Sequence, residues 1–270
     1  MTRRRKGHKC TVFVAGLNGK WTTWLPLLRA MVTLGVDPGA IFVLDFSGTR
    51  FPSTVADLDD VCKHVLAFVS AAGYEELHVV GHSTGGCLAT FMATLVSEDV
   101  QVTNLYSVSG IFVSLFDAAH LSLLPALWFG GGARSLAELR LLAKAGPVAT
   151  FGLRRIAKSD ALTRSVLAGL YSHPDDVPAG EVQSTLQAFN VRTLQDTLDI
   201  GVAYDYRAIY PRVRANVRLV VGDCDPLVTA EDARRAEGLL PHLSACLLKD
   251  TGHFAHLERP VETATQFYLE

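Results

Sequence analysis

The sequence predicts an α/β protein: a doubly wound, mostly parallel sheet of about six strands with one long helical insertion. Short apolar runs alternate with amphipathic helical patterns along most of the 270 residues, and this order is typical of parallel sheets. The alternation stops once, between Val108 and Val217, where roughly one hundred residues carry helical patterns and no convincing strand. With 49% hydrophobic and 19% charged residues, the chain has enough apolar side chains for a large core.

The strands are predicted where short runs are rich in apolar and β-branched residues. Most of these runs are unbroken and do not alternate, as expected when helices cover both faces of a sheet. In chain order they are Thr11–Ala15, Ile41–Phe46, Leu77–Val80, Asn104–Val108, Val217–Val221 and Ala245–Leu248.

Amphipathic segments between these strands predict the helices that pack on the sheet. They are Trp24–Leu34, Val55–Ala71, Gly85–Val96, Thr229–Leu240 and Val261–Leu269. In a sheet of this kind, functional groups collect where strands end and helices begin.

The long connection has helical signals of its own. Ser135-Leu136-Ala137-Glu138 fits a capping box, and the helix that it opens should close at Gly146-Pro147. Asp160 is expected to cap a helix over Ala161–Tyr171, and helical patterns follow over Glu181–Phe189 and Thr193–Ile200. We therefore expect a core made of residues 1–110 and 215–270, and an inserted helical lid over residues 111–214.

Charge and cysteine content narrow the class of protein. A net charge of -2 and a pI near 6.5 do not favour binding to nucleic acid or to a membrane surface. The short basic stretch Arg3–Lys6 is followed by no apolar run long enough for export, so we expect a frayed tail and not a signal peptide. Five scattered cysteines without a Cys-x-x-Cys argue against a disulfide framework or a zinc site. We expect buried, reduced thiols, a cytoplasmic location and no membrane-spanning helix.

Gly81-His82-Ser83-Thr84-Gly85 is the segment that points to chemistry. It follows a predicted strand and opens a predicted helix, the context in which a Gly-x-Ser-x-Gly turn exposes a nucleophilic serine. Serine needs a base to accept its proton and an acid to orient that base. Candidates follow the two later strands: Asp223 or Asp225 after the first, and His253 after the second. All of these residues come at the same edge of the predicted sheet.

These three segments resemble the α/β-hydrolase fold enzymes of the capped, single-domain type. The resemblance implies Ser83 as the nucleophile, His253 as the base and Asp225, in the family's Gly-x-x-Asp pattern, as the orienting acid. The family's Gly-His-x-x-x-x-Glu-x-Pro pattern is also present, with Glu258 and Pro260 in place. It implies an enzyme that needs no cofactor and no metal, and His256 lacks the spacing of a zinc motif.

The chain departs from the family in two places. Where many members carry His-Gly, it has Ala15-Gly16, so the expected oxyanion donors are the backbone N–H groups of Leu17 and Thr84. Only ten residues precede Thr11, so the family's first two strands are expected to be missing. The strand over Ile41–Phe46 would then form an edge of the sheet.

Four aromatic residues are candidates for an apolar acyl pocket. They are Trp21, Trp24, Trp128 and Phe129, and plain core packing is the alternative for each. The sequence does not decide between the two.

The leading functional hypothesis is hydrolysis of a carboxylic ester or thioester through a Ser83 acyl-enzyme. The alternative is an acyltransferase that passes the acyl group to an alcohol or amine, with an acyl-carrier protein among the donors. A lyase or a ligand-binding protein on the same fold is a third reading, because fold does not fix function. The expected partner is a small acyl ester or thioester, and a homo-oligomer is left open.

Overall fold

Six parallel strands form a single sheet in the computed structural model, which describes residues 8–17, 19–46, 49–121 and 131–268. The spatial order is β2-β1-β3-β4-β5-β6, and every neighbouring pair is parallel. The strands are β1 (Lys9–Val14), β2 (Ala40–Leu44), β3 (Glu76–His82), β4 (Gln101–Val108), β5 (Asn216–Gly222) and β6 (Leu243–Leu248). The predicted fold class and strand count are confirmed, and β2 lies at an edge as expected.

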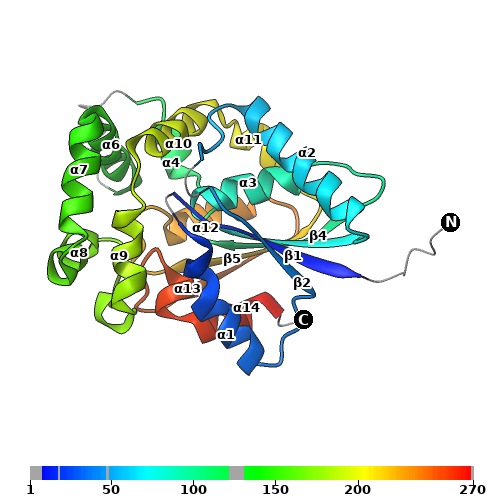
Figure 1. The fold of residues 1–270 in the computed structure, drawn as a ribbon. Coiled ribbons are helices and arrows are strands. Elements are labelled where there is room, and N and C mark those ends of the chain that lie inside the picture. The colour runs from blue at the N-terminus through cyan, green and yellow to red at the C-terminus, as the bar shows by residue number, and fades with distance from the viewer. Residues whose placement is uncertain (1–7, 18, 47–48, 122–130, 269–270) are drawn as a thin grey trace.

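Helices cover both faces of this sheet (Figure 1). Successive residues of β1 show why its apolar run is unbroken: Val12 and Val14 pack into one hydrophobic cluster, and Phe13 between them packs into another. Helices α2 and α3 contribute to the first cluster, and α1 and α14 to the second. The helices packed on the sheet are α1 (Leu25–Thr33), α2 (Val55–Ala71), α3 (Thr84–Met92), α12 (Ala230–Glu237), α13 (Ala255–Glu258) and α14 (Pro260–Tyr268), and the 3-10 turn η1 (Trp21–Trp24) precedes α1.

Between β4 and β5 the described residues form helices and no strand. This stretch, residues 111–214, is called the helical segment below, and most of it lies beside the carboxyl ends of the strands (Figure 1). Its elements are α4 (Ser114–Ala118), α6 (Gly131–Lys144), α7 (Gly146–Ile156), α8 (Asp160–Leu167), η2 (Pro174–Asp176), α9 (Ala179–Gln187), α10 (Val191–Ala203), α11 (Tyr206–Ile209) and η3 (Tyr210–Arg212).

Two predicted helix starts in this segment were wrong. Helix α6 already begins at Gly131, so Ser135 lies inside it, and Glu138 accepts a hydrogen bond from Arg134 instead of closing a capping box. Helix α8 is capped by Ser159, whose hydroxyl accepts from the Leu162 N–H, and not by Asp160. A Ser-x-x-Glu spacing also occurs on the face of a continuous helix, so the pattern alone could not place the boundary.

The cysteines are all free, and three of them, Cys10, Cys62 and Cys87, are buried as expected. Cys224 is exposed, so the expectation of a buried thiol fails there. Among the described residues, no helix combines the length and apolarity needed to cross a bilayer.

Candidate active site

Ser83 occupies a strained turn between β3 and α3. Its φ of 51° and ψ of −126° lie in a region that residues other than glycine rarely adopt. The backbone holds it there: the Ser83 N–H donates to the Val108 carbonyl at 3.0 Å, and its carbonyl accepts from the Gly86 N–H at 2.8 Å. Strain of this kind persists where the surroundings impose it, and it projects the serine from the carboxyl edge of the sheet.

Glycines allow the loop after β1 to approach this turn closely. A Cβ atom on Gly16 would lie 2.8 Å from the Cβ of Ser83, and one on Gly85 would lie 2.3 Å from the Val14 carbonyl oxygen. Any larger residue at these positions would push β1 and the turn apart. Strands β1 and β3 also flank the point where the strand order reverses, which is where open α/β sheets bind ligands.

His253 and Asp225 form a buried pair, and His253 lines the same cavity as Ser83. The Nδ1–H of His253 donates to Oδ2 of Asp225 at 2.9 Å. Oδ1 of Asp225 accepts from the backbone N–H groups of Leu227 at 2.8 Å and Val228 at 3.1 Å. Burial alone would raise the pKa of Asp225, but the charge and hydrogen bond of His253, together with the hydrogen bond from the Leu227 N–H, outweigh it and lower the pKa. The carboxylate is therefore ionised and fixed against the imidazole.

The neighbouring acid, Asp223, has a different place. It is exposed, and its Oδ1 accepts from the Thr251 N–H at 3.2 Å, which ties together the loops after β5 and β6. The structure thus pairs Asp225, and not Asp223, with His253, in agreement with the residue that the resemblance selected.

The loop carrying His253 is also held by the helical segment. The His253 N–H donates to the Leu170 carbonyl at 2.7 Å. Glu258, which is buried, accepts from the Gly252 N–H at 3.0 Å through Oε1, and from the N–H groups of Ser172 at 2.8 Å and His173 at 3.0 Å through Oε2. Sequence reasoning found Glu258 only as part of a motif. It missed Leu170, since a backbone carbonyl leaves no signal in the residue type.

Two more buried histidines lie behind the pair. The Nε2–H of His82 donates to the His253 carbonyl at 3.2 Å, and its ring lies 4.4 Å from that of His256. His256 in turn lies 4.8 Å from the ring of Trp24. Burial, reinforced by the nearby His253, lowers the pKa of His256 to about 3. Burial, reinforced by His256 and then His253, lowers the pKa of His82 well below its usual value. Both rings are therefore neutral packing groups behind the His253–Asp225 pair.

The expected oxyanion donors line the same cavity as Ser83. Thr84 is the first residue of α3, where backbone N–H groups have no acceptor within the helix and where the helix dipole favours negative charge. Leu17 follows Gly16 in the loop that packs against the turn. Two N–H groups at this position can stabilise a developing oxyanion.

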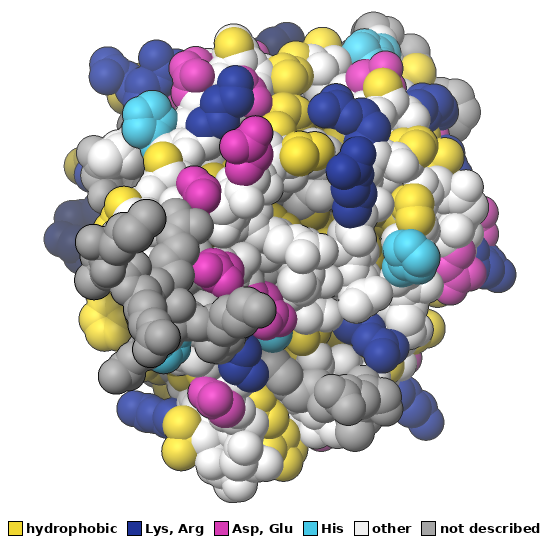
Figure 2. Space-filling view, turned by 90° about the vertical axis from the view of Figure 1, so that its right-hand side faces the viewer, with side chains coloured by type: hydrophobic (Ala, Val, Ile, Leu, Met, Phe, Trp, Pro, Cys, Tyr) yellow, Lys and Arg dark blue, Asp and Glu magenta, His cyan; other side chains and the backbone are white. Residues whose placement is uncertain are grey.

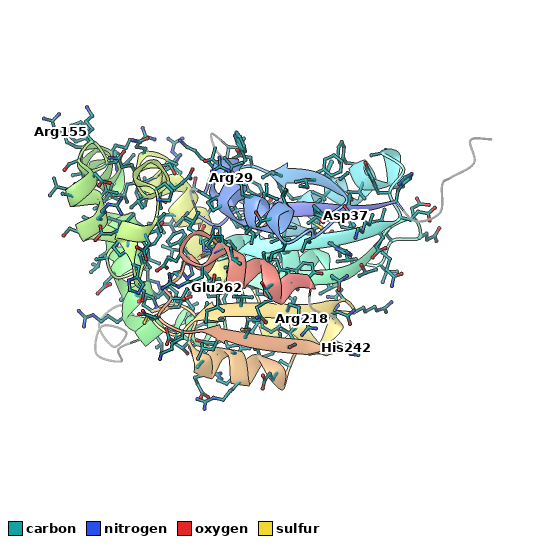
Figure 3. All side chains as sticks on the ribbon, turned by 90° about the horizontal axis from the view of Figure 1, so that it is seen from below. Arg29, Asp37, Arg155, Arg218, His242 and Glu262 are labelled. Atoms are coloured by element: carbon teal, nitrogen blue, oxygen red, sulfur yellow. The ribbon has the colours of Figure 1, made fainter. Side chains whose placement is uncertain are left out.

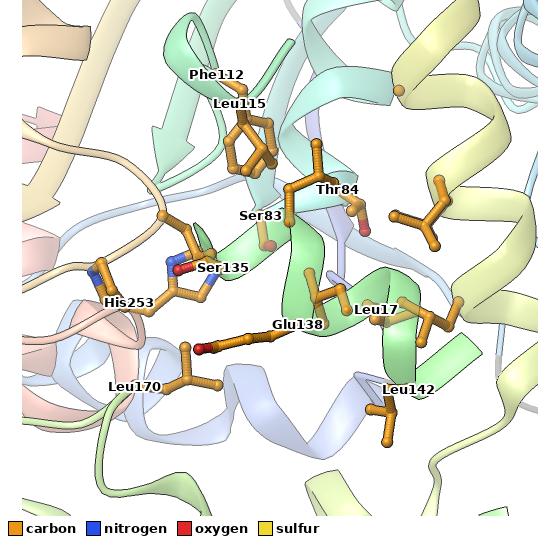
Figure 4. A pocket seen from close by; sticks show the side chains of 18 of the residues that line it. Leu17, Ser83, Thr84, Phe112, Leu115, Ser135, Glu138, Leu142, Leu170 and His253 are labelled. Carbon is orange, nitrogen blue, oxygen red and sulfur yellow. The ribbon is translucent and has the colours of Figure 1, made fainter. Parts of the chain in front are cut away.

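The cavity has a volume of about 580 Å³ and a mostly apolar wall (Figure 4). Ser83 and His253 lie at its wall, and the sheet side and the helical segment both contribute residues. Its apolar lining includes Leu17, Phe51, Leu58, Phe112, Leu115, Phe116, Leu136, Leu139, Leu142, Leu153, Leu167, Leu170, Leu186, Phe189, Leu194, Leu198, Ile200, Leu227 and Phe254. A site of this size and character suits a small apolar ligand.

Two of the three tryptophans predicted for this pocket, Trp21 and Trp24, lie elsewhere. Trp24 is fully buried in the cluster on the opposite face of the sheet, against Phe13 and His256, and Trp21 is 51% exposed. Neither belongs to the cavity wall among the described residues. Trp128 and Phe129 fall outside the described residues. The prediction that Trp24 and Trp21 line an acyl pocket is therefore wrong: Trp24 packs in the core, and Trp21 is exposed at the surface.

Most of the chain matches one known protein family. Residues 11–266 match the family model described as the alpha/beta hydrolase family. Comparison with the curated proteins gave no match.

Solved structures share the fold along almost the whole chain. E-2-(acetamidomethylene)succinate hydrolase has 16% identity and a TM-score of 0.65, over 97% of this chain and 92% of that one. The enol-lactonase from Burkholderia xenovorans LB400 has 14% identity and a TM-score of 0.62, over 97% and 90%. Naproxen esterase from Bacillus subtilis has 15% identity and a TM-score of 0.62, over 98% and 85%. At these identities the likeness concerns the fold alone.

Proposed function

Since the chain belongs to the α/β hydrolase family, we propose that it hydrolyses a carboxylic ester or thioester through an acyl-enzyme on Ser83. The observation that carries this proposal is the buried His253–Asp225 pair, whose histidine lines the same apolar cavity as the strained Ser83. Nucleophile, base and orienting acid are the set that acyl transfer requires.

Each group has a defined role in the proposed reaction. His253 accepts the proton of Ser83 Oγ as this oxygen attacks the acyl carbonyl, and Asp225 stabilises the imidazolium that forms. The N–H groups of Thr84 and Leu17 bind the oxyanion of the tetrahedral intermediate. The intermediate collapses to the acyl-enzyme, and His253 passes its proton to the departing alcohol or thiol. Water then attacks the acyl-enzyme with His253 again as the base, and free acid and Ser83 are released.

The cavity wall favours an apolar acyl group as substrate. Leucine and phenylalanine side chains dominate it, and the polar groups of Ser83, Thr84 and His253 come together at the site of reaction. An acyl chain buried against these side chains gains the free energy of apolar burial. An anionic acyl group would lose hydration and would find no Lys or Arg among the described lining residues, whose acidic member is Glu138.

Transfer of the acyl group to an alcohol or amine is the second candidate. Ser83 is only 8% exposed, and the helical segment contributes much of the wall around it, which would cover the serine as a lid does. Exclusion of bulk water favours another acceptor over hydrolysis. Slow hydrolysis with fast transfer to an added alcohol would support this reading, and fast hydrolysis of simple esters would support the first.

Replacement of the serine tests the shared first step. Ser83→Ala should retain the fold and lose on the order of 10⁴-fold or more in turnover of an activated acyl ester. A fluorophosphonate probe should label the wild type at Ser83. The control is Ser135→Ala, which removes another serine of the cavity wall and should leave the labelling intact. Labelling at another residue, or full activity of Ser83→Ala, would rule out the acyl-enzyme and favour the lyase or ligand-binding reading.

A further inference from the structure

One stretch of the helical segment has an unbalanced charge. Residues 139–159 contain five Lys or Arg side chains and no Asp or Glu, although the whole chain has a net charge of -2. The stretch covers the second half of α6, all of α7 and the turn after it. A near-neutral total charge thus hides a strongly basic region.

The structure gathers three of these five charges with exposed apolar side chains on the outer side of α7. Arg154, Arg155 and Lys158 line a shallow surface hollow together with Phe151, and Arg192 from the start of α10 lines it too. Phe151 is 71% exposed, and Val148, one helical turn before it, is 76% exposed. We call Val148, Phe151, Arg154, Arg155, Lys158 and Arg192 the basic face. Arg155 lies at the outer edge of the helical segment, far from the sheet (Figure 3).

Nearby acids do not neutralise this face. Glu138 pairs with Arg134, and Asp160 pairs with Arg164. In the described part of the chain, none of the four cations of the basic face forms an ion pair. The face seen in Figure 2, turned away from the helical segment, instead shows acidic and basic side chains mixed together. The outer side of α7 therefore carries an unbalanced positive charge that the face shown in Figure 2 does not.

The basic face and the cavity are two sides of one layer of helices. Leu153 of α7 lines the cavity, whereas Phe151 and Arg154 on the same helix line the outer hollow. A surface bound to the outer side of α7 would lie one helix away from the space proposed to hold the acyl group.

We propose that the basic face docks the protein onto an anionic lipid surface. This deepens the proposed function, on which it rests, because it names a lipid-borne ester as the class of substrate. Cations around protruding apolar side chains are typical of helices that lie in a membrane interface, where Phe151 and Val148 would enter the acyl boundary and the cations would meet lipid phosphates. Free phosphate would satisfy the cations but would leave both apolar side chains in water.

Vesicle binding tests the proposal. The full chain is sedimented with vesicles of phosphatidylcholine alone and with vesicles of equimolar phosphatidylcholine and phosphatidylserine. The wild type should bind the anionic vesicles only, and less at high salt. Each cation near an anionic surface contributes roughly a fivefold factor, so Arg154→Gln/Arg155→Gln should bind on the order of 30-fold more weakly. The matched control, Arg212→Gln/Arg214→Gln, removes two exposed charges just before the amino end of β5, outside the basic face, and should bind as the wild type does.

The outcomes separate this proposal from the proposed function. Turnover of a soluble activated ester reports on the active site and should be the same in both double variants and the wild type, while Ser83→Ala should still bind vesicles. Vesicle binding by a wild type that is inactive on every ester would support the docking surface and refute the proposed function. The docking proposal is overturned if the wild type does not bind anionic vesicles, if the two double variants lose binding equally, or if the face binds an acidic carrier protein and no lipid.

Discussion

Glu258 joins the active-site loop to the helical segment, and its replacement by glutamine should damage both stability and catalysis. The carboxylate accepts three backbone N–H groups, one from Gly252 and two from Ser172 and His173. Glutamine has nearly the same shape but only one carbonyl oxygen. Its amide group would present N–H donors to at least one of these backbone N–H groups.

The size of the effect follows from the hydrogen bonds lost. Glu258 is 5% exposed, so water cannot readily replace the missing acceptor. A hydrogen bond to a charged group contributes about 1.5–3 kcal/mol, and a buried donor left without a partner costs a similar amount. Allowing for partial rearrangement, Glu258→Gln should lower the free energy of unfolding by about 2–4 kcal/mol. For a chain of this size that corresponds to a fall in Tm of roughly 5–15 °C.

Catalysis should suffer because Gly252 directly precedes His253. A shift of the imidazole by about 1 Å costs up to on the order of 10²-fold in turnover. Thermal unfolding and turnover of an activated ester are measured side by side, with Glu262→Gln, the same substitution at an exposed site on α14, as the control. A Glu258→Gln protein within about 0.5 kcal/mol of the wild type and with unchanged kcat would refute this reasoning, since that is the range of ordinary surface substitutions.

Two further predictions concern the groups around His253. Asp225→Asn should lower ester turnover on the order of 10⁴-fold by disturbing the His253 tautomer, whereas Asp223→Asn should have a mild effect. The reverse ranking in the same assay would identify Asp223 as the acid. The pKa of His256 falls from 6.5 to about 3 on folding. Between these two pH values the unfolded chain binds a proton at His256 that the folded chain does not, so the free energy of unfolding should fall as the pH drops from 6.5 to about 3. His256→Phe should flatten that part of the curve of unfolding free energy against pH, and an unchanged slope would show that His256 is not responsible.

The sheet could be predicted from the sequence because burial on two faces leaves an unmistakable pattern. In a continuous apolar run such as that of β1, successive side chains pack alternately into the hydrophobic clusters on the two faces of the sheet. A strand of alternating apolar and polar residues could fill only one of these clusters. The helix predicted over Val55–Ala71 has the same first and last residues as α2, whose N-terminus is capped by a capping box of Thr54 and Asp57. The turn at Ser83 was found because its glycines, its strand and its helix are all contiguous in the sequence.

The remaining errors arose where a residue type fits two environments. Trp24 has the apolar surface of a pocket residue, but the same surface packs equally well in the core, and only the course of η1 and α1 places it there. Ser135 and Glu138 have capping spacing, yet the start of α6 depends on tertiary packing. The contact between His253 and the Leu170 carbonyl involves backbone atoms 83 positions apart, so no pattern of side chains could reveal it.

That backbone contact also limits how the cavity can open. The bonds from the His253 N–H to Leu170, from Ser172 and His173 to Glu258, and from His173 Nε2 to Asp250 at 2.7 Å all join residues 170–173 to the active-site loop. Breaking them together would cost roughly 5 kcal/mol or more. An open state at that cost is populated in less than about one molecule in 10³, so a hinge motion of the whole helical segment is a poor route for substrate.

The side-chain hydrogen bonds of helices α6 and α7 described next do not involve the active-site loop. Arg140 of α6 donates to the Leu121 carbonyl, and Thr150 of α7 accepts from the Val191 N–H, and these partners belong to the helical segment itself. Motion of α6 and α7 can therefore leave the bonds at residues 170–173 and the His253–Asp225 pair intact. Substrate entry is expected beside these two helices, and the basic face of α7 would place that entry against a lipid surface.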